Sequence, residues 1–145
     1  MDEILIRRLR EDDADEIIRI EAAITQTPDG LDLKRIVEDQ VHRKGDASYA
    51  AVIGDKIVGY IISYITSGNF GVNKCAWISV LGVDPKYMDQ GIGKRLGEKT
   101  FEHYKEQGIC DVFTTVRWDH TDLLSFFKTL GFDRSNFLHL RKRLD

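Results

Sequence analysis

The chain has 145 residues, enough for one compact domain with a hydrophobic core and too few for two ordinary domains. Its composition, 42% apolar and 31% charged, is typical of a globular protein, and no apolar run approaches the roughly 18 residues of a membrane helix. The net charge of −3 offers no basic surface for nucleic acid, and Met1-Asp2-Glu3 lacks the basic start of a secretion signal, so we expect a single cytoplasmic domain over residues 1–145 with no nucleic-acid or membrane partner.

The N-terminal half predicts a strand, two helices and a pair of hairpin strands. Asp13 and Glu16 have the spacing of a capping box, and Ile17, Ile20 and Ile24 follow at helical intervals. Gly54-Asp55 separates two β-rich segments and suits a two-residue hairpin turn. The expected elements are a strand over Glu3–Leu9, a helix from Asp13, a turn over Thr25–Gly30, a helix over Leu31–Arg43, and strands over Ser48–Ile53 and Ile57–Ser67.

The C-terminal half predicts a third consecutive strand and then alternating helices and strands. The expected elements are a strand over Cys75–Val83, a helix over Gly91–Gln107, a strand over Val112–Val116, a helix over Asp122–Leu130 and a final strand over Phe137–Leu140. Because three consecutive strands precede the glycine-rich turn, the order differs from the strict alternation of a doubly wound nucleotide-binding fold. The sequence therefore predicts a mixed α/β fold.

The cysteines and histidines give no sign of a metal site. Cys75 and Cys110 form neither a Cys-x-x-Cys pair nor a Cys/His cluster, and both are interpreted as free, buried thiols. Apolar neighbours disfavour the thiolate, so packing is a better interpretation than acyl transfer through a cysteine. We expect no metal cofactor.

The segment after Val83 indicates an anion-binding site. A buried strand runs into a turn that opens onto a helix at Gly91 and Gly93. The first backbone N–H groups of a helix lack partners within the helix, and the helix dipole adds positive potential there. Glycine is disfavoured in helices by about 0.5–1 kcal/mol, so two in the first turn suggest a steric requirement. Lys94 and Arg95 add positive charge at the rim, while the patterns of nucleotide triphosphatases and dinucleotide-binding folds are absent.

Two motifs resemble those of the GNAT superfamily of acyl-CoA-dependent N-acetyltransferases. The first is similar to the family's phosphate-binding motif, Gln/Arg-x-x-Gly-x-Gly/Ala, and the second to its C-terminal helix ending in Leu-Gly-Phe. They read Val83-Asp84-Pro85-Lys86-Tyr87 followed by Gln90-Gly91-Ile92-Gly93-Lys94-Arg95-Leu96, and Phe126-Phe127-Lys128-Thr129-Leu130-Gly131-Phe132. The resemblance implies an α/β fold whose mixed, mostly antiparallel sheet has splayed central strands and is flanked by helices.

The resemblance also implies where acetyl-CoA, the co-substrate, binds. The strands Cys75–Val83 and Val112–Val116 would part, and the pantetheine arm would pair with the backbones of Leu81 and Val83. The pyrophosphate would bind the amides of Met88, Asp89, Gln90, Gly91, Ile92, Gly93 and Lys94. The acceptor amine would approach from the opposite side, between the loop Thr25 to Asp32 and the segment after Val116.

The chain departs from the family pattern at the residues that move protons. Met88 replaces the usual Gln or Arg, and Phe127 replaces the Tyr that protonates the departing thiolate in many relatives. Ser79 replaces a frequent Glu base on the strand, and His120 replaces a frequent Asn. Candidate catalytic residues are therefore Ser79, Asp119 and His120, although Asp119 and His120 are equally well interpreted as caps of the following helix.

These observations predict an N-acetyltransferase that moves an acetyl group from acetyl-CoA to a primary amine by direct attack. The acceptor is a small-molecule amine or a protein or peptide amine, and the enzyme acts as a monomer or homodimer. The alternative is a non-catalytic acyl-CoA-binding regulatory module, which the missing Tyr and Glu favour. A third alternative is a structural domain that binds no cofactor.

Overall fold

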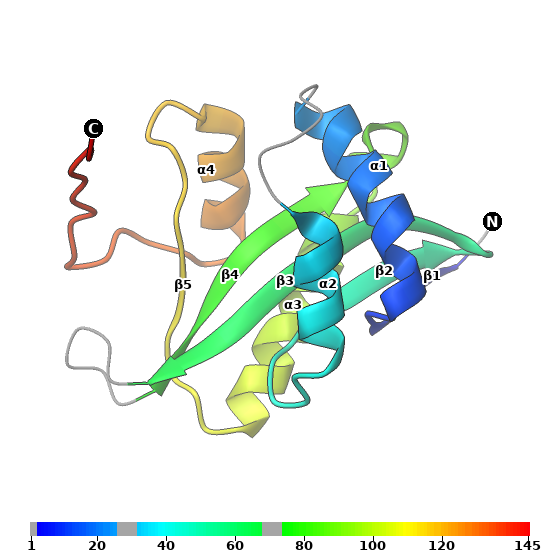
Figure 1. Ribbon diagram of the computed structural model, residues 1–145, viewed down its shortest axis with the longest axis horizontal. Coiled ribbons are helices and arrows are strands. Elements are labelled where there is room, and N and C mark those ends of the chain that lie inside the picture. Colours follow the sequence, from blue (N-terminus) through cyan, green and yellow to red (C-terminus); the bar gives the residue numbers. More distant parts are fainter. Residues whose placement is uncertain (1–2, 26–31, 68–73) are drawn as a thin grey trace. The chain divides into compact units, whose positions relative to one another are not determined.

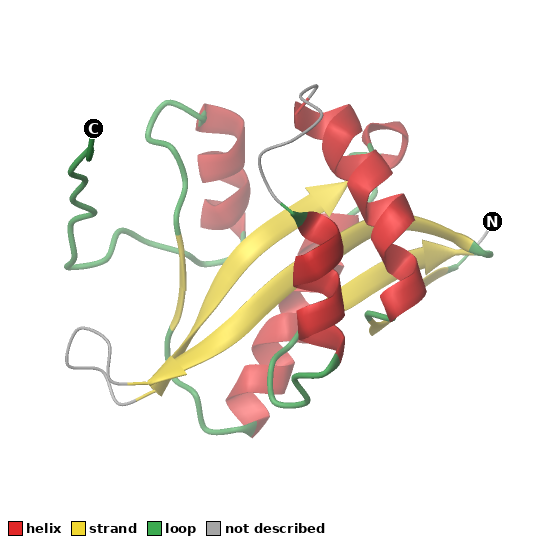
Figure 2. Ribbon diagram, in the orientation of Figure 1, coloured by secondary structure: helices red, strands yellow, loops and turns green. Residues whose placement is uncertain are grey.

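The computed structural model describes residues 3–25, 32–67 and 74–145, and these fall into two compact units, with the boundary in the sequence between Thr115 and Val116. Figure 2 shows the helices, strands and loops. The first unit contains β1 (Ile4–Arg8), η1 (Glu11–Asp13), α1 (Ala14–Thr25), α2 (Leu33–Val41), β2 (Tyr49–Ile53), β3 (Lys56–Ser67), β4 (Lys74–Val83), η3 (Pro85–Tyr87), α3 (Ile92–Glu106) and β5 (Val112–Thr114). The second contains α4 (Thr121–Thr129). That residues 1–145 form a single domain stays a prediction.

The first unit is built on a five-stranded sheet in the order β1-β2-β3-β4-β5. The first four strands pair antiparallel, and β5 pairs parallel to β4. Figure 1 shows α1 and α2 on one face of this sheet and α3 on the other. This arrangement confirms the predicted mixed, mostly antiparallel sheet flanked by helices, including the hairpin at Gly54-Asp55 between β2 and β3.

The core under α1 and α2 follows from the apolar periodicity of these helices. Ile17 and Ile20 of α1 and Val37 of α2 are buried against the strands, where they meet Tyr60 and Ile62 of β3. Burying an isoleucine side chain contributes roughly 1.5–3 kcal/mol, so this contact fixes α1 and α2 to the sheet. Among the helices of residues 3–25, 32–67 and 74–145, none combines the length and apolar character needed to cross a bilayer.

A helix begins where the sequence predicts, but the predicted capping box between Asp13 and Glu16 is wrong, because both side chains bond to other partners. The Asp13 carboxylate accepts two hydrogen bonds from the Arg7 guanidinium of β1, at 2.8 and 2.9 Å. It also accepts one from the backbone amide of Arg10 at 2.7 Å. Glu16 accepts the amide of Ile57 on β3 at 3.0 Å. Both carboxylates thus tie the helix to the sheet, because a guanidinium fork and an open strand amide were within their reach.

Two further sequence predictions are wrong. Residues 137–140 form no strand, and Leu138 and Leu140 are 78% and 86% exposed. A strand is stabilised by a neighbouring strand, and the sheet of the described ranges is made of β1 to β5 without this segment. Cys110 is exposed because it follows the helix on a surface turn, where neighbouring Ile109 is the buried residue, whereas Cys75 is buried as predicted.

Replacing Ile20 with Ala should destabilise the fold by about 2–5 kcal/mol, because a fully buried side chain leaves a cavity beneath α1. Ile18→Ala on the same helix is the matched control, since Ile18 is 37% exposed and its loss should cost about 0.5 kcal/mol. Urea unfolding of both variants measures the difference. Equal losses of stability would contradict the position assigned to α1.

Candidate active site

The strands β4 and β5 part in the middle of β4. Their parallel pairs run from Ala76↔Val112 to Ile78↔Thr114, and the Thr114 hydroxyl donates to the Ile78 carbonyl at 3.1 Å. Beyond Ile78, β4 continues to Val83 while pairing with β3 only, as far as the described residues show. The predicted parting of these two strands is confirmed, and the second half of β4 has an open backbone edge.

A β-bulge at Ser79 turns the backbone at the start of this open edge. The register passes from Ser63↔Ile78 to Ile62↔Val80, which leaves Ser79 as the extra residue on β4. One extra residue reverses which amides face each side of a strand. Before the bulge, Ala76 donates to Asp111 on the β5 side at 3.1 Å. After the bulge, the backbone amides of the odd-numbered residues must face the β5 side.

The amides of Leu81 and Val83 face the open edge. The backbone amide of Asp84 donates to the Val58 carbonyl at 2.8 Å. Gly59↔Val83 is therefore a non-hydrogen-bonded pair of the antiparallel ladder, and the amide of Val83 points away from β3. Leu81 lies two residues earlier and has the same orientation. The structure therefore places the backbone groups of these two predicted residues on the open edge.

The turn after β4 is fixed by the buried side chain of Asp84. Its carboxylate accepts the Lys86 amide at 3.0 Å and lies 3.4 Å from the Arg19 guanidinium of α1. Its carbonyl accepts the Tyr87 amide at 2.8 Å. These contacts set the path of the chain from the end of β4 to the start of α3.

The start of α3 leaves three backbone N–H groups outside the helical hydrogen bonds. Asp89 and Gly91 both have left-handed backbones, with φ of 65° and 76°. The first α3 amide with a helical acceptor is that of Arg95, which donates to Gly91 at 3.1 Å, so the amides of Ile92, Gly93 and Lys94 precede the helical ladder. Such an arrangement of amides and left-handed residues binds anions, and the helix dipole adds to the attraction.

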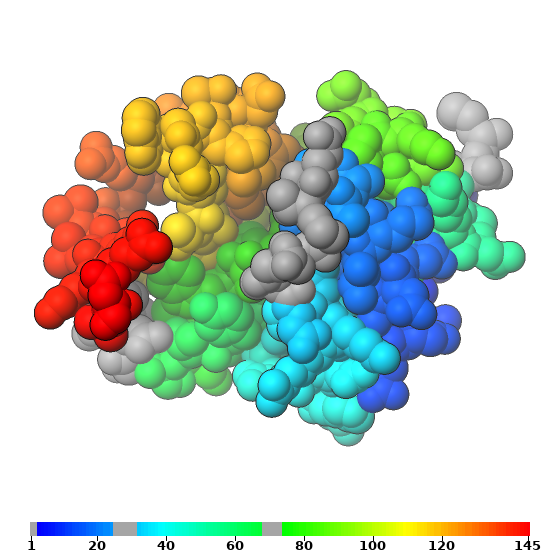
Figure 3. Space-filling view, turned by 45° about the horizontal axis from the view of Figure 1, so that its top comes forward, coloured from blue at the N-terminus to red at the C-terminus, as the bar shows by residue number. Residues whose placement is uncertain are grey.

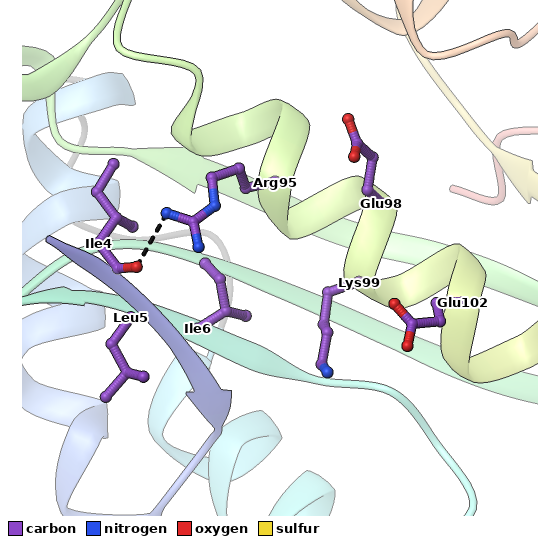
Figure 4. A pocket seen from close by; sticks show the side chains of 7 residues that line it. All are labelled: Ile4, Leu5, Ile6, Arg95, Glu98, Lys99 and Glu102. Atoms are coloured by element: carbon purple, nitrogen blue, oxygen red, sulfur yellow. Dashed lines mark hydrogen bonds between the residues drawn. The ribbon is translucent and has the colours of Figure 1, made fainter.

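The charged side chains next to this turn point elsewhere. Arg95 donates to the Ile4 carbonyl of β1 at 2.9 Å, so its charge is not at the rim where the sequence suggested it (Figure 4). Lys94 lies 3.9 Å from Glu98 in an exposed ion pair. A cavity of about 330 Å³ lies between β1 and α3, and Figure 4 shows the side chains that line it. Among these lining residues, Arg95 is the one from the phosphate-binding motif. The main-chain amides therefore supply most of the positive potential.

The three predicted catalytic residues lie in different settings. Ser79 is exposed at the bulge in the first unit. In the second unit, a hydrogen bond from Arg117 at 3.0 Å holds the pKa of Asp119 below its ordinary value and makes Asp119 a weaker base. The Nδ1 atom of His120 accepts the Leu123 amide at 3.3 Å as the cap of α4, so the neutral ring bears its proton on Nε2.

The remaining predicted site residues add limits to the chemistry. Phe127 is buried against the rings of Phe126 and Phe132, with centroids 5.4 and 5.1 Å away, and it brings no hydroxyl. Trp118 is 86% exposed. Residues 26–31 of the predicted acceptor loop lie outside the described residues. Within residues 3–25, 32–67 and 74–145, no group of three or more His, Cys, Asp or Glu side chains could hold a metal ion.

The sequence analysis missed a polar contact next to the open edge. The buried Tyr60 of β3 donates its hydroxyl to the Glu21 carboxylate of α1. Burial and the bond to Glu21 both raise the pKa of Tyr60, so this hydroxyl stays protonated at neutral pH. The available signal was that Glu21 lies four residues after Ile17 and next to Ile20 on the predicted inward face of α1, whereas Ile24 of that predicted face is 40% exposed.

Comparisons with known proteins agree with this architecture. A solved aminoglycoside acetyltransferase from an uncultured soil metagenomic sample, in complex with sisomicin, is 25% identical, with 98% of this chain and 97% of that chain covered and a TM-score of 0.79. The aminoglycoside N-acetyltransferase AAC(6')-Iy in complex with CoA has a TM-score of 0.83 over 99% of this chain and 97% of that chain, but at 15% identity it shows the fold alone.

Curated relatives match over parts of their length. Mycothiol acetyltransferase of Kocuria rhizophila is 25% identical over 55% of this chain and 26% of that protein. N-alpha-acetyltransferase 30 of Schizosaccharomyces pombe is 25% identical over 68% of this chain and 65% of that protein. The chain thus spans about a quarter of the first relative and about two thirds of the second.

The profile of the Acetyltransferase (GNAT) family matches residues 12–132, which include β4, the turn after it and α4. This match covers most of the chain and confirms the resemblance inferred from the two motifs. The chain belongs to the GNAT acetyltransferase family.

Proposed function

We propose that the protein transfers an acetyl group from acetyl-CoA to a primary amine. The observation that carries this proposal is the placement of two sets of backbone amides at one end of the sheet. Leu81 and Val83 present theirs along the open edge of β4, and the amides of Ile92, Gly93 and Lys94 lie at the start of α3. The first set suits the amide-containing pantetheine arm, and the second suits the pyrophosphate.

Acetyl-CoA would bind through the main chain more than through charged side chains. The pyrophosphate would lie against the amides from Met88 to Lys94. The pantetheine arm would replace β5 as the neighbour of β4 beyond Ile78, in the manner of an added strand. An amide of the open edge would then stabilise the oxyanion of the tetrahedral intermediate.

The reaction needs little acid–base help at the leaving group. The neutral acceptor nitrogen attacks the thioester carbonyl, the C–N bond forms, and the C–S bond breaks to release the CoA thiolate. The nitrogen loses its extra proton to water as the amide forms. A thiol of this type has a pKa of roughly 8–9, so the thiolate can leave near neutral pH without the hydroxyl that Phe127 lacks. Of the three candidate residues, Ser79 would hold a water that relays a proton. His120 would be able to donate a hydrogen bond from its Nε2–H group, and Asp119 would remain paired with Arg117.

The acceptor class is proposed from relatives. One is named an aminoglycoside acetyltransferase, and another an N-alpha-acetyltransferase, a name that indicates the α-amine of a peptide chain. Both acceptors contain primary amines, one small and one at a peptide end. We propose that the protein acts on either kind of amine, as a cytoplasmic monomer or homodimer.

A second function, a non-catalytic acyl-CoA-binding module, is favoured by the residues at positions 79 and 127. Ser79 and the buried Phe127 bring neither a carboxylate nor a phenol to the reaction. Such a module would bind acetyl-CoA and release no CoA.

Substituting Gly91 with Glu should weaken acetyl-CoA binding by about 100-fold or more, since the new side chain brings bulk and negative charge to the amides and strains a φ of 76°. Isothermal titration calorimetry measures this loss. Gly108→Glu at the other end of α3 is the matched control, because Gly108 also has a left-handed φ of 78° with nothing within 4 Å of the added Cβ. Retained affinity in Gly91→Glu would place the pyrophosphate elsewhere.

Turnover separates the two functions. With acetyl-CoA and either sisomicin or a short peptide with a free N-terminus, we expect release of CoA thiol that saturates with the amine and matches the acetylated product by mass spectrometry. Saturable acetyl-CoA binding without thiol release over a broad panel of primary amines would contradict the enzyme and support the module.

A further inference from the structure

Helix α1 sends two carboxylates to the sheet, and they meet different groups. Glu16 accepts the backbone amide of Ile57 at 3.0 Å, so it completes the hydrogen bonding of a strand. Glu21, somewhat more than one turn later, accepts the side-chain hydroxyl of Tyr60. Glu16 therefore supports a strand backbone, whereas Glu21 contacts a side chain of the sheet.

Tyr60 holds Glu21 next to the open half of β4. Tyr60 pairs with Gly82 in the sheet register, and a Cβ built on Gly82 would lie 2.7 Å from Cε1 and 3.0 Å from Oη of Tyr60. The ring thus occupies the space that a side chain at position 82 would need. Its hydroxyl lies beside Gly82 and binds the Glu21 carboxylate, so Glu21 is held near the part of β4 between Leu81 and Val83.

The Glu21 carboxylate lies on the sheet face opposite α3. Tyr60 belongs to the core beneath α1 and α2, whereas a Cβ on the preceding residue, Gly59, would lie 2.9 Å from Ile92 and 3.3 Å from Leu96 of α3. In Figure 3 the surfaces of α1 (blue) and α2 (cyan) lie side by side, and the loop after β4 (light green) adjoins α1, as the Arg19–Asp84 pair requires. An acceptor that approaches the open edge from this face meets Glu21.

The chemistry of the pair suits a cationic amine. A carboxylate can accept several hydrogen bonds, so it can hold an ammonium group as well as the Tyr60 hydroxyl. Glu21 is half-buried, and a charge-assisted bond there is worth more than one on the open surface. Tyr60 is fully buried, so its ring fixes the position of the carboxylate.

We propose that Glu21 binds the ammonium group of the acceptor and that Tyr60 is the residue that positions it. This inference rests on the proposed acetyl transfer. The bound ammonium gives one proton to water, and its nitrogen then forms the C–N bond to the acetyl carbon. The C–S bond breaks, the CoA sulfur leaves as a thiolate, and the nitrogen gives its second proton to water as the amide forms. Glu21 thereby selects acceptors that are cationic at the reacting nitrogen.

Glu21→Gln is the direct test, because it removes the charge while leaving an oxygen for the Tyr60 hydroxyl. With sisomicin or an N-terminal peptide as acceptor, the KM for the amine should rise about 10- to 100-fold, with the Kd for acetyl-CoA unchanged. Glu16→Gln is the matched control on the same helix and should lower the melting temperature without changing the KM for the amine. Glu21→Asp, which keeps the charge, should restore part of the loss.

A second readout does not need turnover. In protein labelled with ¹³C at glutamate carboxyl groups, the Glu21 signal is the one missing from Glu21→Gln. It should move on titration with sisomicin or the peptide, and Tyr60→Phe should weaken that response. The Glu16 signal should stay in place.

The outcomes separate this inference from the proposed function. Normal turnover with an unchanged KM in Glu21→Gln would overturn the role of Glu21 and leave acetyl transfer intact. Movement of the Glu21 signal in a protein that releases no CoA would support the amine site and contradict the enzyme. A Glu21 signal that neither amine moves would overturn the inference.

Discussion

The bulge at Ser79 and the end of the β4–β5 ladder at Ile78 are the constraint on which the site depends. Without the bulge, the amides of Leu81 and Val83 would be used in pairing with β3, and without the parting of the strands they would be covered by β5. The two features together leave a strand edge whose hydrogen-bonding groups are ordered but available. A strand edge of this kind is a binding surface for an extended, amide-containing ligand.

The same end of β4 fixes the start of α3. The sheet approaches the helix closely at Gly59, where a side chain would collide with Ile92, and the buried Asp84 sets the turn that joins the strand to the helix. The helix start is therefore held by packing, by the side-chain capping of η3 and by the Arg19–Asp84 ion pair. Because amides and the helix dipole attract the anion, the site needs few charged side chains, and Arg95 is free to bond to β1.

Local signals in the sequence predicted the fold better than the site. The hairpin at Gly54-Asp55 and the helix after Gly91 depend on residues close in the chain, and both are confirmed. The contacts of Asp13 and the Glu21–Tyr60 pair could not be predicted, because each joins a helix to a strand through partners that only tertiary packing supplies. The strand expected at residues 137–140 failed for the related reason that β-propensity cannot supply a pairing partner.

The most direct test of the central claim is a ¹⁵N–¹H spectrum of the folded protein titrated with CoA. The account predicts that the largest saturable shifts occur at the amides of residues 88–94, with further shifts at Leu81 and Val83. Saturable binding that leaves these amides unchanged, with shifts gathered instead around the cavity between β1 and α3, would contradict it.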